Sequence, residues 1–209
     1  MTQDNQEMDD SEHTKSSLSK CIPSDVNLHR TWSIWYDNPK MVVGGDWKDC
    51  LQKLATFKTV GEFWSLYNNI KAPSQVPLQS NYSVFVENVE PTWEDPANIN
   101  GGKFILTINK KESRVGKTDK YWLFTLMAML GETLDTSGSE IVGAVVSVRK
   151  SESRVSLWLK GTNKDTCERV GEKWKKTLEM DSATTIKFQA HKVAKATGRS
   201  FRNEVQFQV

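Results

Sequence analysis

The sequence predicts an α+β fold in which an antiparallel sheet carries helices on one face. Strand-like and helix-like segments follow one another without the regular alternation of a parallel α/β fold. Two predicted strands, 141–149 and 154–160, are separated by only four residues, and so short a connection requires an antiparallel hairpin. If helices cover one face of such a sheet, the other face is free to hold a ligand.

Composition separates a polar N-terminal segment from one folded domain. Residues 1–27 are polar and poor in aromatic residues, which predicts a disordered tail and leaves residues 28–209 for a single domain. The chain has a formal net charge of +2 although its first segment is acidic, so the domain is mildly basic. Such a charge suits a ligand with a few phosphates and is too weak to coat duplex nucleic acid.

The sequence also indicates the cellular compartment in which the protein is expected. No stretch approaches the roughly 18 consecutive apolar residues of a membrane span, and the acidic start is unlike a signal peptide. The three cysteines are odd in number and widely spaced, which fits neither a disulfide framework nor a zinc site. We expect a cytoplasmic protein without membrane association, with the nucleus as a second compartment.

The remaining elements follow from local patterns. Segments rich in β-branched and aromatic residues predict further strands at 31–36, 82–86, 103–110, 184–190 and 204–209. A capping box at Thr59 and Glu62 opens a helix that ends near residue 70, and apolar periodicity predicts helices over 120–131 and 162–180. The long loop between Pro91 and Gly102 has no predicted structure, and loops of that length are commonly functional.

Eight tryptophans are more than a core of this size needs. Trp93 lies in a proline-bounded loop beside Glu94, and Trp47 follows a Gly-Gly loop. Two indole rings can sandwich a flat base, and a positive charge on that base adds about 1–2 kcal/mol of cation–π attraction. A neighbouring carboxylate accepts the N–H donors of a guanine edge. The plainer alternative, which composition alone favours, is that both rings cover loop ends and Glu94 is solvated.

Three basic residues, Lys103, Arg149 and Arg154, lie where predicted strands begin or end. Their charged groups could converge on a phosphate chain. Taken singly, each is better explained as a solvated surface charge.

The predicted helix over 120–131 is apolar almost all round. One stripe consists of Trp122, Leu126 and Met129, and a second consists of Leu123, Met127 and Leu130. Packing on a sheet needs one stripe, so the second indicates a groove for a partner helix, which Trp64 of the preceding helix would extend. The alternative is a third layer that buries both stripes.

We find no catalytic constellation in the sequence. The segment Gly116-Lys117-Thr118 lacks the upstream glycine of a phosphate loop, and the three histidines form no metal-ligand spacing and no nucleophile–base pair. The sequence therefore predicts a binding protein without a cofactor rather than an enzyme.

Three segments together resemble the translation initiation factor 4E family, which binds the mRNA cap. They are Thr59-Val60-Gly61-Glu62-Phe63-Trp64-Ser65-Leu66-Tyr67-Asn68, Glu90-Pro91-Thr92-Trp93-Glu94-Asp95 with Gly101-Gly102-Lys103, and Gly143-Ala144-Val145-Val146-Ser147-Val148-Arg149. The similarity runs from about residue 28 to the C-terminus. It implies a curved antiparallel sheet with three long helices on the convex face and the cap pocket on the concave face.

The resemblance assigns roles to individual residues. It implies that Trp47 and Trp93 stack on 7-methylguanosine, that Glu94 takes its N1 and N2 donors, and that Trp158 touches the N7 methyl. It implies a phosphate clamp of Lys103, Arg149 and Arg154. On the convex face it implies a site for the scaffold factor 4G and the 4E-binding repressor proteins, formed by Val60, Trp64, Leu123, Met127 and Gly131.

The chain also departs from the family pattern. Val26-Asn27-Leu28 stands where His-Pro-Leu is usual, Phe104 where a Trp is common, and Ser147 where Asn is frequent. The phosphorylatable serine of the family falls near Ser200, for which we infer no modification.

We expect a monomer that binds capped mRNA and recruits 4G. Tryptophan at both positions, Trp32 and Trp47, favours the initiation branch of the family. Two alternatives stay open. One is a cap-binding translational repressor of the same family. The other is a cap-modifying enzyme, which requires an acid/base or metal cluster that the sequence does not display.

Overall fold

The computed structural model describes residues 26–41, 47–181, 183–197 and 205–209. The predicted tail, apart from residues 26 and 27, lies outside these ranges, as does Ser200.

An antiparallel sheet of eight strands, in the order β2-β1-β3-β5-β6-β4-β7-β8, forms the centre of the molecule. The strands are β1 Asn27–Asp37, β2 Gln52–Thr59, β3 Asn81–Val86, β4 Gly102–Asn109, β5 Ile141–Val148, β6 Glu152–Leu159, β7 Lys187–Ala190 and β8 Phe207–Gln208. Every neighbouring pair is antiparallel, which confirms the prediction from the β5–β6 hairpin.

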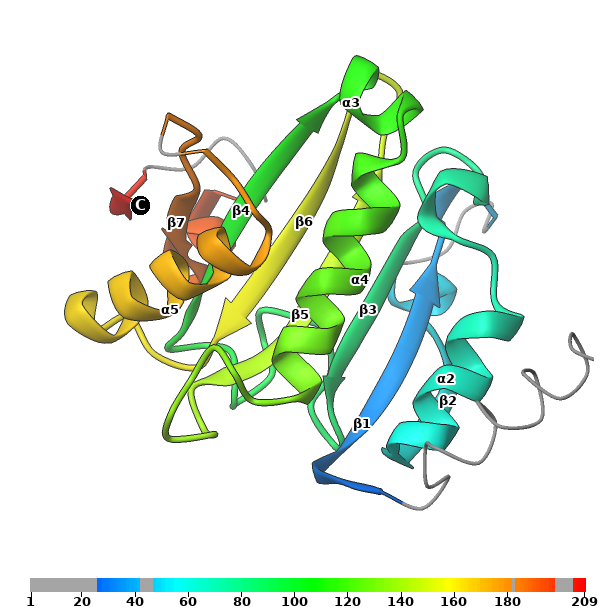
Figure 1. Cartoon of the computed structure of the whole chain (residues 1–209), viewed down its shortest axis with the longest axis horizontal. Coiled ribbons are helices and arrows are strands. Elements are labelled where there is room, and N and C mark those ends of the chain that lie inside the picture. The colour runs from blue at the N-terminus through cyan, green and yellow to red at the C-terminus, as the bar shows by residue number, and fades with distance from the viewer. Residues whose placement is uncertain (1–25, 42–46, 182, 198–204) are drawn as a thin grey trace, which may run out of the picture.

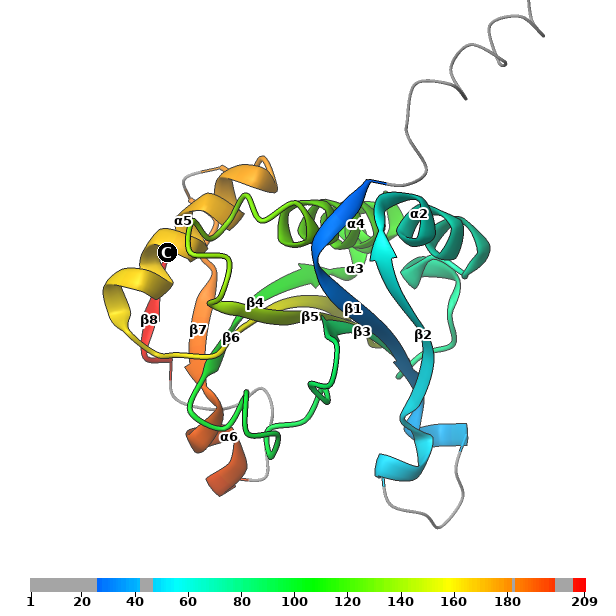
Figure 2. The same cartoon turned by 90° about the horizontal axis from the view of Figure 1, so that it is seen from below.

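The longer helices lie together on one face of the sheet (Figure 1). They are α2 Val60–Asn69, α4 Lys117–Leu130 and α5 Lys164–Thr177. Figure 2 shows the sheet arching beneath them, with the loop between β3 and β4 and the short helix α6 (His191–Thr197) on the opposite, concave side. This curved, unclosed sheet with helices on its convex face is the predicted α+β fold.

Helix α2 begins where the sequence predicts. The Glu62 backbone N–H donates to Thr59 Oγ1 over 3.1 Å, and the Thr59 backbone N–H donates to Glu62 Oε2 over 3.2 Å. These two bonds satisfy backbone groups that the first helical turn leaves without partners, so the capping box fixes where the helix starts.

The alternation of side chains along each strand assigns them to two different surfaces. Residues directed to the helix side form the main core, among them Ile34, Val84, Phe104, Ala144, Val146, Val155 and Leu157. Three tryptophans, Trp32, Trp122 and Trp174, are fully buried there, and Trp174 Nε1 donates to Thr125 Oγ1 over 2.9 Å. Phe104 is also fully buried, so its replacement of the family's Trp is a change within the core.

The intervening strand residues face the concave side and are mostly small or polar. Ser83, Ser147 and Ser156 belong to this set. A second apolar cluster interrupts them, formed by Phe85, Val142 and Trp158 with Trp93 packed against it. The concave face therefore combines an aromatic island with a hydroxyl-lined floor.

Some elements differ from the prediction. The edge strand β2 and the short helices α3 (Lys110–Arg114) and α6 were not predicted, because none of them has a strong periodic pattern of its own. The second apolar stripe of α4 is narrower than expected, since Leu130 is buried while Met127 is 50% exposed. Leu130 packs in the main core between the sheet and its helices.

We predict that Gly143→Ala destabilises the fold by about 1–3 kcal/mol. A Cβ atom at this position would lie 2.5 Å from Cγ of Phe85, which is fully buried and packs edge-on against Trp158 at 5.2 Å. Chemical denaturation measures the loss. Gly161→Ala is the matched control, because its Cβ would meet only Glu140 Oε2 at 3.5 Å. Equal stability of the two variants would contradict this account.

Candidate functional site

A cavity of about 410 Å³ opens on the concave face of the sheet. Strands β1, β3, β4, β5 and β6 and the loop after β3 contribute to its wall. The lining residues are Asp37, Pro39, Asn81, Ser83, Pro91, Thr92, Trp93, Glu94, Lys103, Val145, Ser147, Arg149, Ser156 and Trp158.

The loop that carries Trp93 and Glu94 is tied down on both sides. Asp95 Oδ2 accepts from the Glu90 backbone N–H over 2.9 Å, and buried Asn98 donates through Nδ2 to the carbonyls of Glu90 (2.9 Å) and Thr92 (2.8 Å). These bonds supply partners for a loop backbone that has no strand neighbours. Trp93 is therefore held half-buried at the cavity, with the exposed Glu94 next to it.

Lys103 brings a positive charge into the aromatic part of the cavity. Its side chain is 3% exposed, and its Nζ lies 5.9 Å from the centroid of the Trp93 ring and 5.4 Å from that of Trp158. Burial, with repulsion by Arg154, lowers the pKa of Lys103 to about 7. The faces of two indole rings partly offset this desolvation of the ammonium.

His191 supports Trp158 from behind. It is 1% exposed, and its ring lies 4.1 Å from that of Trp158 with an interplanar angle of 36°. Burial, with the charge of Lys103, lowers the pKa of His191 to about 3. His191 is therefore a neutral packing group at physiological pH and adds no charge to the aromatic wall.

Arg149 is held at the other end of the cavity. Its guanidinium donates to the carbonyl oxygens of Ser80 (3.2 Å) and Val148 (3.0 Å) and to Asn81 Oδ1 (2.9 Å). Burial and repulsion by Arg154 lower the pKa of Arg149. These bonds leave the guanidinium positive and oriented, as recognition of an anion requires.

Arg154 lies beside the cavity rather than in its lining. Its guanidinium pairs with Glu152, and its backbone position opposes Ser147 across the β5–β6 ladder. Its charge nevertheless acts on both Lys103 and Arg149. The three predicted basic residues therefore lie close enough for the charge of Arg154 to act on the other two, and those two line the cavity.

The structure thus brings together five of the seven residues predicted for the concave site: Trp93, Glu94, Trp158, Lys103 and Arg149. Trp47 begins the short 3-10 turn Trp47–Cys50, and its side chain lies outside the part of the chain that the structure describes.

Sequence reasoning missed Asp37, Asn81 and His191. Asp37 has the same strand parity as Ser33, so alternation along β1 places its side chain on the concave face, and this signal was available. No local pattern points to His191, which reaches Trp158 only through the pairing of β7 with β4.

The convex face carries the residues predicted for partner binding. Trp64 is half-buried against Phe63 and Tyr67, at ring distances of 5.0 Å and 5.9 Å. Val60 begins α2, and its N–H donates to the carbonyl of Val26, which is 45% exposed. This backbone bond brings Val26, which stands where the 4E resemblance leads us to expect histidine, next to the first residue of α2.

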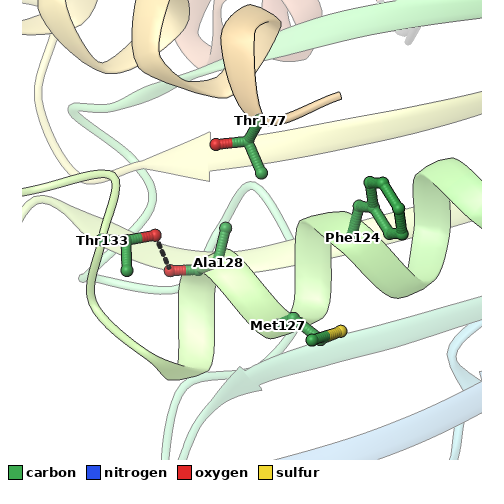
Figure 3. Close-up of a pocket in the computed structure, with 5 residues that line it drawn as sticks. All are labelled: Phe124, Met127, Ala128, Thr133 and Thr177. Atoms are coloured by element: carbon green, nitrogen blue, oxygen red, sulfur yellow. Dashed lines mark hydrogen bonds between the residues drawn. The ribbon is translucent and has the colours of Figure 1, made fainter. Parts of the chain in front are cut away.

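A smaller cavity, of about 310 Å³, adjoins Met127 on the same face (Figure 3). Phe124, Met127, Ala128, Thr133 and Thr177 line it, and Thr133 Oγ1 donates to the Ala128 carbonyl over 3.2 Å. Leu123 directly precedes Phe124 in the chain and is half-buried. Gly131 is the exposed C-cap of α4. The convex surface thus has an open apolar region on α4.

Among the described residues, no group of three or more His, Cys, Asp or Glu side chains is placed to hold a metal ion. In the same part of the chain, no helix has the length and apolar character needed to cross a membrane.

A family model for eukaryotic initiation factor 4E matches residues 27–206. The chain belongs to the eukaryotic initiation factor 4E family. Initiation factor 4E of Saccharomyces cerevisiae is 37% identical over 200 residues, with 94% of this chain and 92% of the relative covered. Initiation factor 4E-1 of Arabidopsis thaliana is 39% identical, with 87% and 75% covered.

Solved structures of 4E proteins share the fold. The complex of C. elegans eIF4E-3 with the 4E-binding protein Mextli and a cap analog has a TM-score of 0.79 and 32% identity, covering 88% of this chain and 99% of that one. Ascaris suum eIF4E-3 with the m7G cap has a TM-score of 0.79 and 35% identity, covering 88% and 97%. The similarity to 4E proteins therefore extends over nearly the whole described domain.

We predict that Lys103→Met stabilises the free 4E-family protein near pH 7 and that this advantage disappears as the pH rises. The unfolded lysine keeps its proton up to a pKa of 10.5 and the folded one only up to about 7, so unfolding binds a proton between these values. The stability of the wild type therefore rises with pH across this range, whereas the uncharged methionine contributes no such dependence.

Urea denaturation at about pH 7 and about pH 10 measures this difference. Lys187→Met, on an exposed residue of β7, is the control and should change stability little at either pH. A constant difference between Lys103→Met and the wild type would show that the buried ammonium carries no desolvation cost.

Proposed function

We propose that this chain binds the 7-methylguanosine cap of mRNA in the concave cavity, acts in translation initiation, and performs no catalysis of its own. The observation that carries the proposal is the division of one cavity into an aromatic, acidic end and a basic end. Such a division matches a ligand whose flat cationic base is joined to an anionic phosphate chain.

The strand register supports this division. Gly143 pairs with both Phe85 and Trp158, which marks the aromatic end, and Ser147 pairs with both Asn81 and Arg154, which marks the basic end. The two positions are four steps apart along the strand, or about 13 Å. A nucleoside with a phosphate chain spans such a distance.

Solved relatives support the same ligand. Ascaris suum eIF4E-3 forms complexes with the m7G cap and with the m2,2,7G cap, and C. elegans eIF4E-3 forms one with a cap analog. The present chain shares their fold and places an indole, a carboxylate and basic groups around a cavity.

We infer the residue roles from this arrangement. Trp93 stacks on the base with Trp47 on its other side, Glu94 accepts the N1 and N2 donors, and Trp158 contacts the N7 methyl. Arg149 binds the phosphates from the basic end, Lys103 binds them from the aromatic end beside Trp158, and Arg154 adds long-range attraction. Methylation at N7 makes the base cationic, which strengthens stacking between indole faces.

We also infer that the convex face binds a helical segment of the scaffold factor 4G or of a 4E-binding repressor. Val60, Trp64, Leu123, Met127 and Gly131 would form this surface. Its exposed Met127 and adjoining apolar cavity suit an amphipathic helix. C. elegans eIF4E-3 forms a complex with the 4E-binding protein Mextli. Such a role places the protein in the cytoplasm, where mRNA is translated.

Tryptophan fluorescence titration with 7-methyl-GTP and with GTP tests cap binding. We predict quenching and tighter binding of the methylated nucleotide, because only that base carries a positive charge. Trp93→Ala should weaken 7-methyl-GTP binding by about 1–3 kcal/mol, since one stacking face is lost. Phe124→Ala, on the opposite face, is the control. Equal affinity for both nucleotides would refute the proposal.

We predict that Trp64→Ala weakens binding of a 4G-derived peptide by at least tenfold, or about 1.4 kcal/mol, and leaves 7-methyl-GTP affinity unchanged. Trp64 lies on the convex side, and the sheet separates it from the cavity. Fluorescence anisotropy with a labelled peptide gives the first value, and nucleotide titration gives the second. If the wild type binds repressor peptides but no 4G peptide, the protein belongs to the repressing branch.

A further inference from the structure

The carboxylate of Asp37 is connected to Arg149 through a single amide. Asn81 Nδ2 donates to Asp37 Oδ2 over 2.6 Å, and Asn81 Oδ1 accepts from Arg149 over 2.9 Å. Asp37 and Asn81 are register partners at the ends of β1 and β3, so two neighbouring backbones fix their separation. The three side chains form a relay along the wall of the cavity.

The relay has one consistent orientation. A carboxylate accepts hydrogen bonds and a guanidinium only donates them, so the Asn81 amide must turn its NH2 to Asp37 and its oxygen to Arg149. Without an acceptor at position 37, the Asn81 NH2 loses its partner and the amide is held from one side only. The side chain of Asn81 is then free to move, and Arg149 loses the rigidity of one of its three anchors.

Charge alone predicts a different role for Asp37. A carboxylate near a phosphate site repels the ligand, so its removal should strengthen binding. Asp37 is 8% exposed, and the groups that act on it are Asn81 and Arg149; Cys50 lies within reach of its charge. Burying a carboxylate at an anion-binding site costs free energy, which suggests that its hydrogen bond to Asn81 stabilises the site.

We propose that Asp37 is a positioning residue for the phosphate chain of the ligand: it orients the Asn81 amide, which in turn holds the Arg149 guanidinium in the cavity. The inference rests on the proposed function, because it assigns Asp37 to the phosphate end of the cap site. Asp37 ends β1, Asn81 begins β3 and Arg149 directly follows β5, so three separate segments bring these side chains together.

Two substitutions separate positioning from charge. Asp37→Leu removes both the acceptor and the charge, and Asp37→Asn removes the charge but keeps an acceptor oxygen. Positioning predicts that Asp37→Leu weakens 7-methyl-GTP binding about five- to tenfold, whereas Asp37→Asn stays within about twofold of the wild type. An electrostatic role predicts tighter binding in both variants and would overturn the inference.

The nucleoside 7-methylguanosine provides a readout that a merely structural role would move. It has no phosphates, so its affinity should be unchanged in Asp37→Leu. An equal loss for nucleoside and triphosphate would overturn the inference, because the substitution would then damage the pocket as a whole. Thermal denaturation of each variant checks that the fold is intact.

A double-mutant cycle tests whether Asp37 acts through Arg149. In an Arg149→Ala background, Asp37→Leu should have no further effect on 7-methyl-GTP affinity, and Asn81→Leu should behave in the same way. Additive losses would refute the relay. If the wild type itself fails to bind 7-methyl-GTP, the proposed function fails first, and that result is distinct from a wild type that binds and an unaffected Asp37→Leu.

Discussion

The pleat of a single antiparallel sheet gives the protein two surfaces of opposite character. Alternate residues of each strand are apolar and face α2, α4 and α5, while their neighbours are small, polar or charged and face the concave side. Register is therefore critical, because a slip of one residue would move Lys103 into the core and Phe104 into the cavity. The antiparallel pairing of β4 with both β6 and β7 fixes that register from two sides.

The concave cavity holds a buried ammonium and a half-buried guanidinium. Lys103 is buried between two indoles, and neutral His191 supports one of them without adding charge. Arg149 is anchored by backbone carbonyls rather than by a direct salt bridge, so most of its charge stays available to a ligand. This is preorganisation, in which the protein meets the ordering cost during folding rather than during binding.

The two faces would also allow one small domain to bind two partners. The proposed cap and protein sites lie on opposite sides of the sheet and do not compete for the same surface. C. elegans eIF4E-3 forms a complex with the 4E-binding protein Mextli and a cap analog. Two residues of this chain lie at the edges of the two sites. Val26 changes the border of the convex surface, and Asp37 places an acid in the wall of the cavity.

Much of this protein could be predicted from its sequence, because the relevant signals are local. The capping box of Thr59 and Glu62 spans one helical turn, and Trp93 and Glu94 are adjacent in the chain. The β5–β6 hairpin follows from a short connection. The family motifs add a predicted phosphate-binding role for the basic residues, a role that their positions at strand ends had left open.

Only the tertiary structure decided the contacts that join distant strands. It buried Leu130, placed Arg154 beside the cavity rather than in it, and brought His191 behind Trp158. The relay from Asp37 through Asn81 to Arg149 links residues from separate parts of the chain. Local sequence fixes which residues can form a helix or strand and which face each presents. Strand order and register decide which of those faces meet, and they depend on packing over the whole sheet.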